Sequence, residues 1–332
     1  IDAGAAKTPA DMVILNGQLV NVNSAEIYPA DVAIYRSQIV ATGDVSDYIG
    51  SKTEKIDAQG KYLVPGLIDG HLHIECSKLS MTSFAKAVVP HGTTSIVSGL
   101  DQYIVTAGLT GIREILDEID QGPLKVFWGL PFITPYTLPK SNVGFNVTAE
   151  THREVQKWPE VFGVWETVSE FIENQHDDVI KAIELARENR LPVFGCAPMT
   201  QGSRLNSVLC AGVRLDHESY DHQEMMEKVR KGMYVLIRES SISHFMHENL
   251  KIVTHLNPRI SRRVSFCTDD VTAADITRNG HMDKLVRMAI SCGVDPLTAI
   301  QMGSINSAEA YRVDHLVGSI SPGRFADILL VD

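Results

Sequence analysis

Two histidines, His71 and His73, stand one residue apart in the stretch LIDGHLHIE, directly after apolar residues that predict a buried strand. Because side chains alternate along a strand, both imidazoles point to the same face while Leu72 points to the other. Two neutral imidazoles on one face can bind a single cation, and histidine is the side chain that most often binds metals. The alternative for such a pair is two hydrogen-bonded core residues.

Other polar side chains stand at the ends of separate apolar runs. Glu166 ends VFGVWE, His217 ends VRLDH, and Asp269 ends VSFCTD. A carboxylate can bridge two cations, and a carboxylate beside a metal ion can also accept the proton of an attacking water. We therefore expect these side chains to join the histidine pair in a metal site, with Asp269 as general base and Glu166 as the second catalytic carboxylate. Taken singly, Glu166 could be salt-bridged at the surface and His217 a hydrogen-bonded histidine at a barrel end.

The elements that must position these residues begin at Leu67, where short apolar runs alternate with longer amphipathic stretches. This alternation predicts repeated β-then-α units around a parallel sheet. Eight runs predict strands: LIDGHLHI, TTSIVS, LKVFWGLP, VFGVWE, LPVFGCA, VRLDHE, MYVLIRES and RVSFCTDD. Helical spacing is found in MTSFAKAVV, GIREILDEID, VIKAIELAREN, HQEMMEKVRKG and HMDKLVRMAISCG. Eight units favour an α/β fold of the (β/α)8 TIM-like barrel type over an open doubly wound sheet, and the polar strand ends then converge on the barrel mouth, where active sites of this fold lie.

Residues 11 to about 64 have a different pattern. The short alternating runs DMVILNGQLVNV and ADVAIYRSQIVATG are separated by polar turns and predict a small antiparallel β element. The final ADILLVD is an apolar run that also predicts a strand. At 332 residues the chain can therefore hold one large domain and a small accessory element.

Charge and cysteine content exclude several classes of protein. Acidic residues outnumber basic ones, 41 to 30, and the net charge of −11 repels nucleic acids and anionic membrane surfaces. No apolar run approaches the length needed to cross a bilayer. The five cysteines are odd in number and widely spread, which fits a reducing cytoplasm. We expect no nucleic-acid or membrane partner, a homo-oligomer, no secretory signal, and a natural start before Ile1.

Several motifs resemble the adenine deaminase branch of the amidohydrolase superfamily, from about residue 11 to the end of the chain. They are VPGLIDGHLHIE, PHGTT, AGVRLDHESY, LIRESS, FCTDD, NGHMDKLVR and SPGRFADILLVD. The resemblance implies a barrel hydrolase with two divalent ions, typically iron, manganese or zinc, that activate water to attack C6 of adenine and expel ammonia. By matching motif, His71, His73 and Asp269 would hold one ion, Glu166 would bridge, and His217 would hold the second.

The resemblance also implies how the chain is divided. Residues 1–64 would form a small β-sandwich element, completed by about residues 318–332. Residues 65–317 would form the metal-dependent barrel, and members of the family usually carry a further C-terminal domain.

Two departures from the family pattern bear on metal and substrate. The family has a Gly-His-x-Pro pattern at the end of the fifth strand, whereas this chain has GCAP, which places Cys196 in the ligand position. A thiolate can bind zinc or iron, so Cys196 is either a ligand for the second ion or a buried thiol beside a weak or absent second site. The family's Asp-Pro-His-Glu becomes residues 98–101, SGLD, which leaves the substrate open because those family residues lie near it.

The predicted substrate-binding residues are Asp101, Trp128, Glu218, Arg238 and Glu239. Aromatic side chains after the third strand, Trp128 with Phe132 and Tyr136, could line a pocket for a planar ring or simply pack the loop. A guanidinium at the end of LIRESS could bind a substrate carbonyl or carboxylate, or form an internal ion pair.

Two further residues have open alternatives. Asp270 could be catalytic or could be the N-cap of the helix that follows. His281, in NGHMD, could contact the site residues from behind or cap a helix.

The function predicted first is therefore metal-dependent hydrolysis of a small nitrogen heterocycle, by deamination of adenine or a related aminated ring. Opening of a cyclic amide or imide by the same residues is the alternative within this class of enzymes. A non-catalytic scaffold barrel is the alternative outside it, favoured by the replaced histidine and opposed by the other retained ligands.

Overall fold

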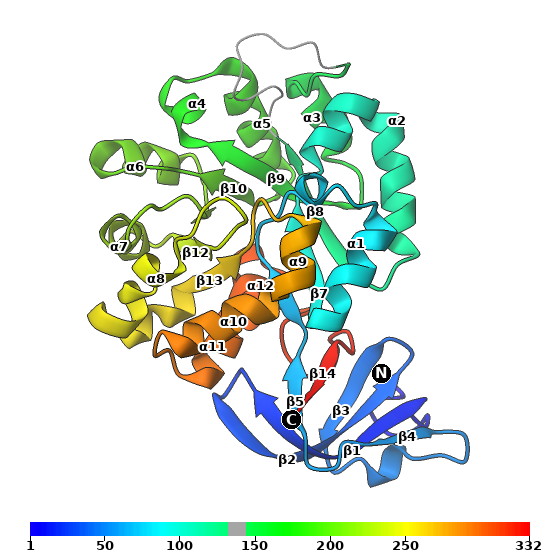
Figure 1. Ribbon diagram of the computed structural model, residues 1–332. Helices are drawn as coiled ribbons and strands as arrows, with labels where there is room; N and C mark the ends of the chain where they lie inside the picture. Colours follow the sequence, from blue (N-terminus) through cyan, green and yellow to red (C-terminus); the bar gives the residue numbers. More distant parts are fainter. Residues whose placement is uncertain (132–143) are drawn as a thin grey trace.

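The computed structural model describes residues 1–131 and 144–332. Across these residues, eight short parallel strands form the predicted barrel, and each overlaps one of the eight apolar runs. They are β6 (Leu67–Asp69), β7 (Thr93–Ser98), β8 (Lys125–Pro131), β9 (Val161–Val168), β10 (Val193–Cys196), β11 (Leu215–Asp216), β12 (Tyr234–Arg238) and β13 (Val264–Cys267). Figure 1 shows helices around the outside of these strands. The predicted α/β barrel fold is confirmed.

The helices follow the amphipathic stretches of the sequence. In the described ranges they are α1 (Met81–Val88), α2 (Asp101–Asp120), α3 (Ala149–Val155), α4 (Ser169–Glu173), α5 (Asp177–Glu188), α6 (Gly202–Cys210), α7 (His222–Arg230), α8 (Met246–Asn249), α9 (Ala273–Asn279), α10 (Met282–Ser291), α11 (Pro296–Met302) and α12 (Ile305–Tyr311). On α5, for example, Val179, Ala182, Ile183 and Ala186 are buried at helical spacing. Helix α2 is longer than predicted and is kinked at Gly108, whose φ of 63° lies in the region that favours glycine.

Two seams, each joining strands of different sheets, close the barrel. At the β13–β6 seam, the backbone N–H of Asp269 donates to the carbonyl of His71 (2.9 Å). The N–H of His73 donates in turn to the carbonyl of Asp269 (3.2 Å). Backbone pairing at this seam therefore extends to the residues that follow the strand ends at the mouth.

The β10–β11 seam is paired only in its deeper part. Val193 pairs with Val213, and the N–H of Arg214 donates to the carbonyl of Val193 (3.0 Å). Among the described residues, no backbone hydrogen bond joins Cys196 to Asp216, where these strands end at the mouth. Side chains must therefore hold these two strand ends together.

The small β element is one sheet that includes both ends of the described chain. Its strands are β1 (Met12–Asn21), β2 (Glu26–Tyr35), β3 (Gln38–Gly43), β4 (Glu54–Asp57), β5 (Tyr62–Pro65) and β14 (Ile328–Val331). The predicted pairing of the last strand is confirmed, because β14 runs antiparallel to β5 (Figure 1). The two runs that predicted an antiparallel element form β1, β2 and β3, which pair antiparallel, whereas β4 and β5 join parallel to β1, so the whole sheet is mixed. The division into residues 1–64 with 318–332 and a barrel of 65–317 stays a prediction.

Two observations concern the surroundings of the protein. None of the helices in the described residues is long and apolar enough to cross a membrane. All five cysteines lie in the described ranges and are free thiols. A cytoplasmic location and a homo-oligomer stay predictions.

Candidate metal centre

The predicted first metal position lies where β6 and β13 end. Nε2 of His71 is 3.3 Å from Nε2 of His73, and Oδ1 of Asp269 is 3.4 Å from each nitrogen. All three side chains are buried. Two nitrogens that each lie about 2.0–2.1 Å from a tetrahedral zinc ion are separated by about 3.3–3.4 Å. The structure thus brings these side chains, from segments far apart in the sequence, to the spacing of one coordination sphere.

Glu166, on β9, lies between two histidines. Its Oε2 is 3.6 Å from Nε2 of His73, and its Oε1 is 3.8 Å from Nε2 of His217. Each oxygen faces a different histidine, which is the arrangement expected of a bridging carboxylate. Burial raises the pKa of Glu166 to about 8, although the charge of His73 opposes this. A divalent cation between these groups would favour the ionised carboxylate.

Glu166 and Asp269 share an unfavourable backbone conformation. Their φ angles, 48° and 56°, lie in the left-handed region that residues other than glycine seldom adopt. Such a residue costs about 1–3 kcal/mol and persists only where its surroundings hold it. At Asp269 the holding contacts are the backbone hydrogen bonds of the β13–β6 seam. Strain at two carboxylates of one cluster is typical of a functional site.

The predicted second metal position lies at the β10–β11 seam. Cys196, His217 and Glu218 each offer a ligand atom, and these atoms lie within 4.8 Å of one another. His217 is fully buried, and neither of its ring nitrogens has a hydrogen-bond partner among the described residues. Leaving a buried polar group without a partner is costly. A metal ion here would give this imidazole a partner, so the residues present fit a bound cation.

Burial keeps two imidazoles of this centre neutral, which is the form that binds metals. It lowers the pKa of His71 to about 4 and holds the pKa of His217 well below its usual range. Burial and the charge of Glu166 hold the pKa of the Cys196 thiol well above its usual range. Because a coordinated metal deprotonates a thiol, Cys196 would become a ligand only together with the ion.

Asp101, predicted to bind substrate, lies behind His73. Its Oδ2 is 3.2 Å from Nδ1 of His73 and accepts a hydrogen bond from the indole N–H of Trp165 (3.2 Å). The ring of Trp165 stacks on that of His71, with the centroids 4.2 Å apart. A carboxylate on the second ring nitrogen fixes the orientation of a metal-binding histidine. These contacts support an orienting role for Asp101.

Arg238 joins the two predicted metal positions. Its Nη1 donates to Oε1 of Glu218 and to Oδ2 of Asp269, the latter at 2.5 Å. Arg238 therefore forms an internal ion pair, which was the alternative to a substrate contact in the sequence analysis. Glu239 contacts a different residue, accepting a hydrogen bond from Nδ1 of His244 (2.8 Å).

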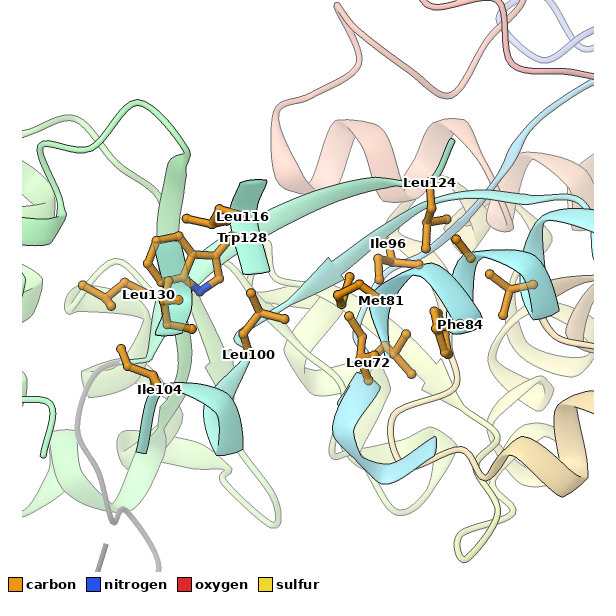
Figure 2. Packing of buried hydrophobic residues seen from close by; sticks show 14 of the residues in the cluster. Leu72, Met81, Phe84, Ile96, Leu100, Ile104, Leu116, Leu124, Trp128 and Leu130 are labelled. Atoms are coloured by element: carbon orange, nitrogen blue, oxygen red, sulfur yellow. The ribbon is translucent and has the colours of Figure 1, made fainter. Parts of the chain in front are cut away.

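Trp128, predicted to line a substrate pocket, lies in the hydrophobic core. It is fully buried in the same cluster as Leu100 (Figure 2). Its indole N–H donates to the carbonyl of Gly99 (2.8 Å). The packing role that the sequence left as an alternative accounts for these contacts. Phe132 and Tyr136 lie outside the described residues.

Asp270 is not the cap of the helix that follows it. The N-cap of α9 is Thr272, whose side chain accepts a hydrogen bond from the N–H of Asp275. The capping alternative was wrong because the backbone stays extended as far as Thr272, with φ −89° and ψ 151°. Asp270 accepts a hydrogen bond from the thiol of Cys76 instead (2.9 Å).

Asp69, which the sequence reasoning missed, holds the β13–β6 seam from inside. Its Oδ1 accepts hydrogen bonds from the backbone N–H groups of His71 (3.2 Å) and Thr268 (3.1 Å). Oδ2 of Asp69 is 3.4 Å from Nε2 of the buried His281, which therefore contacts the site from behind. His281 also stands at the N-cap position of α10, but its side chain makes no capping hydrogen bond. The available signal was an aspartate inside the apolar run LIDG.

A buried lysine was also missed. Lys228 on α7 is fully buried, and its Nζ lies 2.8 Å from Oδ2 of Asp216, the residue before His217. The available signal was its spacing, because Glu224 and Lys228 share the buried side of the helix with Met225.

Solved structures share the architecture described above. An N-acetylglucosamine-6-phosphate deacetylase from Pasteurella multocida matches with a TM-score of 0.68 and 16% identity, over 95% of this chain and 93% of that one. An adenosine deaminase from Xanthomonas campestris with bound zinc matches with a TM-score of 0.61 and 15% identity, over 97% of this chain and 84% of that one. These likenesses show the fold, a (β/α)8 barrel with an accessory β element.

Sequence comparison then shows the family. A profile of the amidohydrolase family matches residues 62–332, and the chain belongs to this family. It is 64% identical over 332 residues to adenine deaminase 1 of Desulfotalea psychrophila and 61% identical over 332 residues to adenine deaminase 1 of Latilactobacillus sakei. It is 60% identical over 330 residues to adenine deaminase 4 of Rhizobium meliloti. The alignments cover 99–100% of this chain but 55–56% of these relatives, so the chain spans about half their length.

Proposed function

We propose that this chain is the metal-binding barrel of a hydrolase that deaminates adenine or a closely related aminated ring. The observation that carries the proposal is the cluster of imidazole, carboxylate and thiol donors at the barrel mouth, around a buried His217 whose ring nitrogens have no hydrogen-bond partner among the described residues. Relatives that are 60–64% identical carry the name adenine deaminase, which supports this substrate. Their activity extends to this chain as a proposal, because the chain spans about half their length.

The proposed cofactors are two divalent ions of zinc, manganese or iron. The proposed ligands are His71, His73 and Asp269 for the first ion, Cys196 and His217 for the second, and Glu166 as the bridge. A bound divalent ion supplies Lewis acidity, which lowers the pKa of water towards neutrality. Imidazole, thiolate and carboxylate donors together suit zinc and iron.

Asp269 is proposed to accept the proton of the attacking water. Although burial opposes ionisation, the hydrogen bond with His71 holds the pKa of Asp269 well below its usual range. The carboxylate is therefore ionised at neutral pH. Arg238 holds its Oδ2, while its Oδ1 faces the imidazole of His71. When the carbon–nitrogen bond of the substrate breaks, the proton leaves with ammonia.

Glu218 is proposed to contact the substrate ring. Burial raises its pKa to about 7, although the charge of Arg238 opposes this. A fraction of the carboxyl groups therefore carries a proton near neutral pH. Donation of that proton to a ring nitrogen would make the neighbouring carbon more electrophilic, which is a general-acid role.

Opening of a cyclic amide or imide is the second candidate. The observation that favours it is the departure of residues 98–101 from the family pattern, where Asp101 is engaged by His73 and Trp165. The resemblance places this segment near the substrate, whereas Asp101 here contacts the ring of His73, and this leaves room for a different ring.

The test is release of ammonia from adenine, a panel of other aminated rings and a panel of cyclic amides by the purified, metal-supplemented protein. We expect ammonia from adenine or a related aminated ring, and its loss on chelation. Ring opening of an amide without ammonia would favour the second candidate, and no ammonia from any aminated ring would overturn deamination. A scaffold would hold less than one metal ion per chain and show no hydrolysis with added manganese or zinc.

A further inference from the structure

A fully buried ammonium group lies beside the second metal position. Nζ of Lys228 donates to the carbonyl of Ala197 (2.6 Å), to Oδ2 of Asp216 (2.8 Å) and to Oε1 of Glu224 (2.6 Å). It is also 3.0 Å from the hydroxyl of Ser219. A buried charge is tolerated only when it is paired and hydrogen-bonded, and every one of these partners is itself buried.

Two of these partners, Ala197 and Asp216, lie where the strands of the β10–β11 seam end. Ala197 directly follows Cys196, and Asp216 directly precedes His217. The N–H of Ala197 donates to Oδ1 of Asp216 (2.7 Å). Because no backbone hydrogen bond joins these strand ends in the described residues, the contacts through Asp216 and Lys228 replace the missing pairing.

The same network holds the loops that follow the two strands. Oε1 of Glu224 accepts a hydrogen bond from the N–H of Met199 (2.8 Å), in the loop after β10. Oε2 of Glu224 accepts one from the N–H of Tyr220 (3.1 Å), in the loop after β11. Lys228 and Glu224, one helical turn apart on α7, thus tie both loops to one rigid element.

We propose that Lys228 is a positioning residue that sets the distance between Cys196 and His217 and thereby controls binding of the second metal ion. The first ion does not depend on it, because its ligands are held by the backbone bonds of the β13–β6 seam. The inference rests on the proposed function only in requiring two metal positions. Lys228 touches no reacting group and acts through the two strand ends.

The experiment loads the metal-free protein with cobalt chloride. Cobalt per chain is measured by elemental analysis, and thiolate-to-cobalt charge-transfer absorption reports whether sulfur binds the ion. We expect two ions and the absorption in the wild type, and a fall to one ion with loss of the absorption in Lys228→Met. The matched control is Lys231→Met at the C-cap of the same helix, which removes a partly exposed ion pair with Glu227 (2.8 Å) and should keep both ions.

A second variant keeps the test decisive if Lys228→Met fails to fold. Asp216→Asn combined with Lys228→Met removes the ammonium together with the charge of Asp216, one of its two buried carboxylate partners, so the variant still lacks the cation that links the strand ends. A folded double variant with one ion and no charge-transfer absorption supports the proposal. Two ions with that absorption in either folded variant, or a single ion without it in the wild type, would overturn it. Two ions in a wild type that releases no ammonia would refute deamination alone.

Discussion

The two seams of the barrel hold the two halves of the metal centre by different means. At the β13–β6 seam, backbone hydrogen bonds join Asp269 to His71 and His73 at the barrel mouth. At the β10–β11 seam the backbone pairing ends at Val193 and Val213, and buried side chains around Lys228 connect the strand ends. Geometry held by the backbone tolerates side-chain replacement nearby, whereas geometry held by one lysine does not.

A buried aspartate lies at each seam and accepts a backbone N–H from the opposite strand. Asp69 accepts from Thr268 (3.1 Å), and Asp216 accepts from Ala197 (2.7 Å). Burial raises the pKa of Asp69 to about 7. Burial acts in the same direction on Asp216, but the charge of Lys228 outweighs it and lowers the pKa to about 2. The ammonium group of Lys228 therefore keeps Asp216 ionised, whereas Asp69, whose pKa is about 7, is partly protonated near neutral pH.

The largest expected effect is that of Asp269→Asn at the β13–β6 seam. Ammonia release from adenine should fall by about 10²–10⁴-fold, because the group that accepts the proton is removed. The first ion should remain bound, since an oxygen ligand and the backbone bonds of the seam remain. Steady-state rates and metal content measure both effects, with the exposed Asp120→Asn as control. An unchanged rate would refute the role of Asp269 as base.

The pair Asp69→Asn and Asp216→Asn should show opposite pH dependence of stability in metal-free protein. The raised pKa of Asp69 means that the folded state binds more protons between pH 3.8 and about 7, so wild-type stability falls as pH rises through this window. The lowered pKa of Asp216 gives stability that is present above pH 3.8 and lost as pH falls towards about 2.

Urea unfolding of both variants and the wild type across these pH ranges measures the difference. The advantage of the wild type over Asp69→Asn should shrink with rising pH, by about 1.4 kcal/mol for each unit between the folded and unfolded pKa values. Its advantage over Asp216→Asn should shrink with falling pH. If the stability differences of the two variants from the wild type changed with pH in the same direction, Lys228 would not be the cause of the different aspartate pKa values.

Cys196→His should have a smaller effect, because an imidazole replaces a thiol at the second position. With cobalt, the chain should keep two ions and lose the thiolate-to-cobalt absorption, while activity stays within about tenfold, equivalent to about 1.4 kcal/mol. Elemental analysis and absorption spectra measure this, and Cys210→Ser, at an exposed thiol, is the control. Absence of the absorption in the wild type would show that Cys196 is a packed thiol.

The smallest expected effect is that of Thr272→Ala, just beyond the β13–β6 seam. Loss of the N-cap of α9 should lower the free energy of unfolding by about 1 kcal/mol, measured by urea unfolding. Asp270→Asn should leave this helix intact, because Asp270 does not cap it. The reverse ranking of the two variants would restore the capping role predicted for Asp270.

Much of the fold follows from local patterns in the sequence. Apolar runs alternating with amphipathic stretches predicted the barrel strands and most of the helices, because burial of one face requires that spacing. The side-chain period of a strand placed His71 and His73 on one face, and the carboxyl ends of parallel strands gave the position of Glu166 and Asp269. These inferences use only the spacing of residues that are close in the sequence and the general geometry of the (β/α)8 barrel.

The tertiary structure alone decided how the strands meet and which charged side chains are buried. The helical spacing of Lys228 places it on the side of Met225 but does not by itself bury its charge, because the burial depends on Ala197 and Asp216, which lie outside this helix. Long-range packing also places Trp128 in the hydrophobic core and Asp101 beside His73, and neither position follows from local spacing. Contacts between distant segments follow from closure of the barrel, a property that local spacing does not contain.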